Sequence, residues 1–156
     1  MTLFHLYLNG SLGVHMFNLN YYIDHILKIA STRFGKVFYS ILAGSIGAVI
    51  LVLFLTGMTL SAGIGKILPV IVGFNTALTG YMVLEKTRHG FKYKRAVSIA
   101  SGVVMVLVTA AFLNIMYFRG AGVFLISVVD LTTLLGIGIV TSGLGGMLAI
   151  KYFNLR

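Results

Sequence analysis

Four long apolar runs limit what this chain can fold into. They cover residues 37–58, 67–84, 96–118 and 121–150, and the fourth contains a single charged residue, Asp130. A helix needs about 20 apolar residues to cross a membrane, so each run is long enough. Membrane strands instead alternate apolar and polar residues over about 10 positions, and these runs do not alternate. The pattern predicts an all-α integral membrane protein with four transmembrane helices in a bundle.

Composition supports lipid as the solvent of this chain. Of its 156 residues, 58% are hydrophobic and 10% are charged, and the mean hydropathy is +1.01. Soluble domains carry roughly 25% charged residues, so this chain has too few to cover a water-exposed surface. The absence of cysteine excludes disulfides, thiolate metal sites and cysteine nucleophiles.

The cations predict how the spans are oriented. Lys66 and Arg119 follow the first and third runs, whereas ten cations lie on the other side of the predicted spans: Lys28, Arg33, Lys36, Lys86, Arg88, Lys92, Lys94, Arg95, Lys151 and Arg156. Cytoplasmic loops carry an excess of Lys and Arg. We therefore expect both termini and the segment 86–95 to face the cytoplasm of a bacterium or archaeon, or the inner side of an organelle membrane. Because the cations separate apolar runs and form no continuous patch, we expect no nucleic-acid partner.

The segment 1–36 precedes the transmembrane domain 37–150, and residues 151–156 form a short basic tail. Between Tyr21 and Lys36, apolar residues recur at helical spacing, which predicts a short amphipathic helix on the inner leaflet. No cation precedes Lys28, so we expect no cleavable signal peptide. Met1 and Met16 both remain candidates for the first residue.

Small residues recur four apart within the runs. Small residues at this spacing lie on one face of a helix and let two membrane helices approach closely. Close packing matters in a membrane because lipid is as apolar as the side chains, so the hydrophobic effect does not drive helices together. The fourth run has two such rows and the first run contributes two glycines, so the expected helix-packing residues are Gly138, Ser142, Gly146, Thr141, Gly145, Ala149, Gly44 and Gly47. These rows predict packing within the bundle or a docking surface for a second copy or another subunit, and both interpretations stay open.

Asp130 is the most unusual residue of the apolar runs. If the fourth helix starts near Ala121, Asp130 lies about 14 Å along its axis, near the middle of a bilayer. A charge there is costly and marks a candidate proton or cation site. Asn75 would lie at a similar depth, and the other candidate members are Thr132, Thr133 and Thr76. If the membrane helix instead starts at Leu131, Asp130 lies at the membrane interface, where its negative charge interacts favourably with the dipole of the helix.

Other chemistry is sparse in this sequence. It shows no Ser–His–acid set, no phosphate-binding loop and no metal-ligating spacing, so we expect no enzyme activity, no metal and no cofactor. The basic segment between the second and third runs determines topology or contacts anionic lipid headgroups, through Lys86, Arg88, Lys92, Lys94 and Arg95.

The stretch "VGFNTALTGYMVLEKTR" resembles the second span of the ATP synthase protein I family, with its glycines, its asparagine and its cationic end. Gly73, Asn75 and the segment 86–95 are the matching positions. The resemblance implies an assembly helper for the rotor ring of the synthase. The long N-terminal segment and Asp130 depart from the family's pattern.

Two functions follow as hypotheses. The first is a non-enzymatic membrane protein that serves as an assembly factor or accessory subunit, in a homo-oligomer or a membrane complex, through packing of small residues. The alternative is a small proton- or cation-coupled transporter or channel that uses Asp130 and Asn75.

Overall fold

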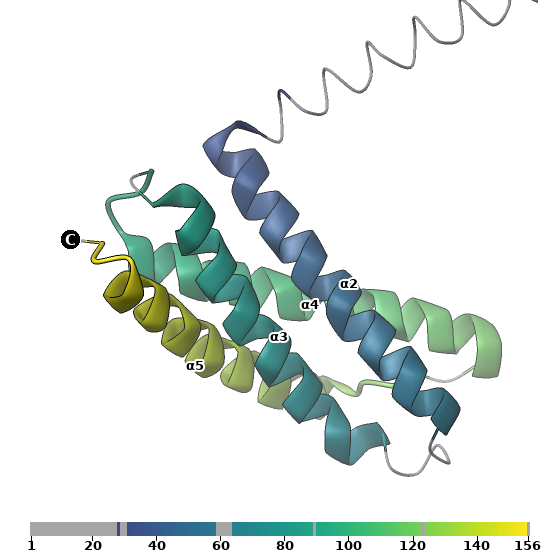
Figure 1. Cartoon of the computed structure of the whole chain (residues 1–156). Helices are drawn as coiled ribbons and strands as arrows, with labels where there is room; N and C mark the ends of the chain where they lie inside the picture. The colour runs from purple at the N-terminus through teal and green to yellow at the C-terminus, as the bar shows by residue number, and fades with distance from the viewer. Residues whose placement is uncertain (1–27, 29–30, 59–63, 89, 123, 156) are drawn as a thin grey trace, which may run out of the picture. The chain divides into compact units, whose positions relative to one another are not determined.

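The computed structural model describes residues 28, 31–58, 64–88, 90–122 and 124–155. This part of the chain contains four long helices and no strand. They are α2 (Arg33–Met58), α3 (Ile64–Thr87), α4 (Lys94–Ala121) and α5 (Val128–Tyr152) (Figure 1). All four are long and apolar enough to cross a membrane. The amphipathic helix predicted before residue 37 lies mostly outside the described residues.

The first three helices contain the predicted apolar runs and extend beyond them into the flanking cations. The fourth does not: α5 begins at Val128, whereas the apolar pattern predicts a start at residue 121. α4 continues to Ala121, and Gly122 then ends it in the left-handed conformation, with φ of 69°. A glycine adopts this conformation without a steric penalty. The residues that separate α4 from α5 are therefore a short connection, although their composition is apolar.

Asn114 of α4 fixes this connection. Its side-chain amide donates to the carbonyl oxygen of Ile126 at 3.1 Å and its side-chain oxygen accepts from the Ile126 N–H at 2.8 Å. Ile126 is buried. The two bonds satisfy the backbone N–H and carbonyl of Ile126, which lies between the two helices.

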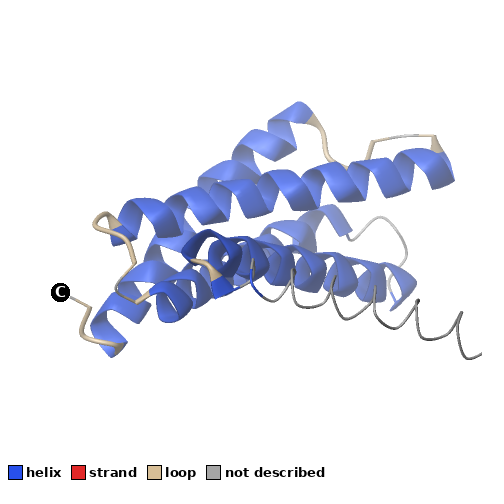
Figure 2. Ribbon diagram, turned by 90° about the horizontal axis from the view of Figure 1, so that it is seen from above, coloured by secondary structure: helices blue, strands red, loops and turns tan. Residues whose placement is uncertain are grey.

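The described helices from Lys36 onward belong to one compact unit, Lys36–Arg156. α3, α4 and α5 pack against one another, most extensively along α3 and α5 (Figure 1). Residues of all four helices share a core that includes Val52, Val72, Met105 and Leu134, each at most 2% exposed. In Figure 2 the loops lie at the helix ends.

Contacts at the ends show that successive helices run in opposite directions. The Lys86 ammonium, near the end of α3, lies 4.1 Å from the centre of the Tyr39 ring, near the start of α2. The hydroxyls of Thr56 and Tyr117 lie 3.3 Å apart and join the ends of α2 and α4. The start of α2 from Lys36 on, the end of α3, the start of α4 and the end of α5 therefore share one end of the unit.

Candidate functional site

Asp130 lies in the first turn of α5. Its carboxylate accepts from the Ser127 hydroxyl at 2.7 Å and from the Ser127 N–H at 3.2 Å. The Ser127 hydroxyl oxygen is in turn 3.2 Å from the Asp130 N–H, which completes a capping box. Both residues are exposed. Asp130 therefore satisfies donors that every helix start leaves without an intrahelical partner.

This position is close to the helix start that the interface interpretation of Asp130 assumes, and it differs from the start that a midplane position assumes. A midplane aspartate requires a helix that starts near residue 121, and α5 starts at Val128. Asp130 lines a small cavity with Leu68 and Pro69, near the start of α3. Asn75 lies six residues beyond Pro69, which is about 9 Å further along the helix axis. The structure thus separates the two main members of the candidate ion site.

Thr132 and Thr133 are also exposed at the start of α5. Both hydroxyls donate to the carbonyl oxygen of Val129 in their own helix, at 2.7 and 3.1 Å. Hydroxyl groups in helices commonly bond in this way to the preceding turn. Neither residue forms a cluster with Asn75 or Thr76. The five predicted site residues therefore lie in two separate places, at the start of α5 and further along α3.

Asn75 and Thr76 lie inside the unit. The Asn75 amide donates to the Ile71 carbonyl at 2.9 Å, and its side chain is 5% exposed. Its oxygen faces Gly47 of α2, where an added Cβ would lie 2.9 Å away. The Thr76 hydroxyl lies 2.6 Å from that of Thr141 and links α3 to α5. These polar groups are therefore satisfied between packed helices.

The small-residue rows of α5 face the other helices of the same chain. Gly138, Ser142, Gly145, Gly146 and Ala149 are all buried. A Cβ added at Gly145 would overlap the backbone carbonyl of Ala77 in α3. One added at Gly146 would overlap the hydroxyl of Ser98 in α4. Because these glycines have no side chain, the backbone of α5 lies directly against α3 and α4, as expected for small residues in membrane helices.

A pair of serines joins α4 and α5 at the centre of this contact. The Ser98 hydroxyl donates to the Ser142 carbonyl at 2.7 Å, and the Ser142 hydroxyl donates to the Ser98 carbonyl at 2.5 Å. Gly80 of α3 and Gly102 of α4 make room for this pair, because a Cβ at either position would overlap Ser142. This contact therefore brings together Gly80, Ser98, Gly102, Ser142 and Gly146.

The two glycines predicted in the first run have the same role in α2. A Cβ added at Gly44 would overlap the hydroxyl of Thr79, and Gly47 faces Asn75. Thr79 is fully buried and its hydroxyl donates to the Asn75 carbonyl at 2.8 Å. Packing within the chain thus accounts for these glycines and for the inner rows of α5, as one of the two sequence interpretations expects.

Gly136 of α5 differs from these glycines. It is exposed, and a Cβ added there would have no atom within 4 Å. A glycine within a helix costs about 1 kcal/mol relative to alanine. No packing inside the described part of the chain offsets this cost at Gly136.

The basic segment lies at the shared end of α3, α4 and α5. Lys86 is placed over Tyr39, and the Arg88 guanidinium lies 4.5 Å from the centre of the Phe153 ring. Such cation–π contacts hold a charged group at the edge of an apolar surface. Lys92, Lys94 and Arg95 line an open cavity together with the end of α5.

Sequence reasoning missed two features of these sites. The spacing of Ser98 and Gly102 shows a small-residue row, but spacing alone does not reveal that Ser98 is paired with Ser142. The second feature is the left-handed conformation of Asn154, with φ of 48°. Asparagine tolerates this conformation better than most residues, and its position three residues after Lys151 was an available signal for the end of α5.

Searches against models of protein families, curated proteins and solved structures found no match to this chain. The resemblance to ATP synthase protein I thus stays a prediction from one segment.

Proposed function

We propose that this chain is a non-enzymatic four-helix bundle that crosses a membrane and serves as an accessory subunit or assembly factor of a membrane complex. Both termini and the segment 86–95 would face the cytoplasm or its organelle equivalent, because the cations gather at that end. The simplest complex of this kind is a homo-oligomer, in which the partner is a second copy of this chain. The resemblance to ATP synthase protein I makes a rotor ring the first partner to test.

The main support for this proposal is the composition of the bundle interior. No Asp, Glu, Lys or Arg side chain is buried in the described part of the chain, and the backbones of α3, α4 and α5 meet at glycines. Ion-coupled transporters place ionisable groups in the bundle interior or along a water-filled path. The absence of buried charged side chains among the described residues favours a structural role over ion-coupled transport through the bundle.

The outer face of α5 is the candidate contact with a partner. Only a third of its most apolar stretch is buried, less than in the other three candidate spans. Gly136 lies on this face with open space around it. A partner helix packed against Gly136 would explain why a glycine occupies an exposed helical position.

Replacing Gly136 with leucine tests the proposal. The new side chain has room in the chain itself, so the melting temperature in detergent should be retained, but it should displace a helix docked on α5. The measurement is the native mass of the complex extracted from its own membrane in mild detergent, and the amount of each co-purified subunit. We expect the subunits that co-purify with the wild-type chain in fixed proportion to be lost from the Gly136→Leu variant.

Ala100→Leu serves as the matched control, because Ala100 is exposed on α4 and gains a side chain of similar size. It should keep the complex intact. Equal loss in both variants would argue against docking on α5. A monomeric wild type, together with reconstituted ion flux that disappears in Asp130→Asn, would contradict the proposal and favour the transporter alternative.

A further inference from the structure

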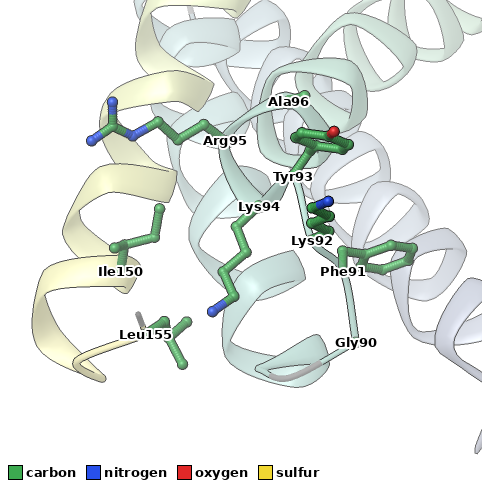
Figure 3. Close-up of a pocket in the computed structure, with 9 residues that line it drawn as sticks. All are labelled: Gly90, Phe91, Lys92, Tyr93, Lys94, Arg95, Ala96, Ile150 and Leu155. Carbon is green, nitrogen blue, oxygen red and sulfur yellow. The ribbon is translucent and has the colours of Figure 1, made fainter.

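An open cavity of about 970 Å³ lies at the basic end of the unit, between the start of α4 and the end of α5. Its lining combines cations with apolar side chains, among them Lys92, Lys94, Arg95, Ile150 and Leu155. Figure 3 shows Lys94 extending towards Leu155 and Arg95 extending towards α5. Phe91 and Tyr93 lie on the opposite side of the loop.

The apolar part of this cavity is built by the end of α5. The Leu155 N–H donates to the Ile150 carbonyl at 3.0 Å, and the Asn154 N–H donates to the Lys151 carbonyl at 3.4 Å. With Asn154 in the left-handed conformation, these two bonds form a Schellman motif. The turn folds Leu155 back against Leu84 and Ala149, where it is 6% exposed.

The described residues that line the cavity include three cations, Lys92, Lys94 and Arg95, and no Asp or Glu. The chain contains three Asp and Glu residues against twelve Lys and Arg. Asp130 lies at the opposite end of α5. Glu85 lies near the end of α3, at the basic end of the unit, but it does not line the cavity. A ligand bound here would therefore meet Lys94 and Arg95 beside an apolar surface, which is the chemistry of a phospholipid at the level of its phosphate.

We propose that this cavity binds the headgroup of an anionic phospholipid, with Lys94 and Arg95 on the phosphate and with Ile150 and Leu155 against the glycerol and first acyl carbons. The inference rests on the membrane placement proposed above and is independent of any protein partner. It narrows a general attraction between five cations and anionic lipid to one site with two cations. Loss of a partner through Gly136→Leu and loss of lipid here are separate measurements.

The test uses the full chain purified in detergent and titrated with phosphatidylglycerol, with bound lipid counted by native mass spectrometry. Each cation near an anionic lipid surface contributes about a fivefold change in binding. The double variant Lys94→Gln with Arg95→Gln should therefore bind phosphatidylglycerol about 30-fold more weakly than the wild type. Its melting temperature should stay that of the wild type, because both residues lie at the open start of α4.

The matched control is Lys86→Gln with Lys151→Gln, which removes the same charge from the same end but leaves the cavity lining intact. Retained phosphatidylglycerol binding in this control supports a localised site. An equal loss in both double variants would overturn the site, because it would show diffuse attraction. If the first double variant melts early, Arg95→Gln alone provides the test, with an expected loss of about fivefold.

Two further ligands identify the source of the phosphate. Phosphatidylcholine carries no net charge and should bind much more weakly than phosphatidylglycerol. Glycerol 3-phosphate has the phosphate without acyl chains and should also bind weakly. Phosphatidylcholine binding as tight as that of phosphatidylglycerol would overturn recognition of an anion, and tight binding of glycerol 3-phosphate would overturn the assignment to a lipid.

Discussion

At the scale of single residues, Asp130 shows how the same letters allow two predictions with different functional meaning. The apolar residues before it predict a longer helix and a buried charge, whereas the spacing Ser127-x-x-Asp130 matches a capping box. The hydrogen bonds between Ser127 and Asp130 decide for the second. Hydropathy could not make this choice, because the connection between α4 and α5 is itself apolar and is held by Asn114.

A double-mutant cycle tests this role of Asp130. Ser127→Ala and Asp130→Ala should each lower the free energy of unfolding by about 1 kcal/mol, the usual cost of a lost helix cap. Because each removes the same reciprocal bonds, the double variant should lose little more than either single one. Unfolding in detergent by heat or denaturant measures this. Fully additive losses would mean that the two residues act independently, and Thr133→Ala controls for changes elsewhere in the same turn.

At the scale of elements, α5 uses its glycines in two ways. Gly138, Gly145 and Gly146 are buried against neighbouring helices, whereas Gly136 faces outward. The four-residue spacing predicts a broad face of small residues and a close approach of helices. Spacing alone could not decide whether the neighbour belongs to the same chain, because lipid-facing and protein-facing sides of such a helix are both apolar. That decision needed the positions of Ala77 and Ser98.

The contrast between Gly145 and Gly136 gives a prediction within one helix. Gly145→Ala should destabilise the chain by about 1–3 kcal/mol, because its Cβ would overlap the Ala77 carbonyl and push α5 from α3. Gly136→Ala should be neutral or stabilising by up to about 1 kcal/mol, since the new Cβ meets nothing and alanine favours the helix. Thermal unfolding of both variants in the same detergent compares them. Equal melting temperatures would refute the close contact of α3 and α5.

At the scale of the whole molecule, the charge pattern and the helix directions agree. The cations of the segment 86–95, Lys36 and Lys151 lie at the end shared by the α2 start, the α3 end, the α4 start and the α5 end, whereas Lys66 and Arg119 lie at the other. The sequence predicts the four apolar helices well, because run length and flanking charge depend on local composition alone. The basic-end cavity could not be predicted, because it needs the fold-back of Leu155 against residues that are distant in the chain.

The last prediction concerns orientation in the membrane. Four crossings with the cations inside place Gly90, between α3 and α4, in the cytoplasm and Gly122, between α4 and α5, outside. Reporter domains that are active on one side only, inserted at each position, should give opposite signals, and a reporter after Lys151 should match Gly90. Exchanging the charge bias, with Lys92, Lys94 and Arg95 replaced by Gln and three Lys added beside Gly122, should reduce this difference or invert it. Equal signals from Gly90 and Gly122 in the wild type would rule out four crossings, because α4 would then not pass from one side to the other.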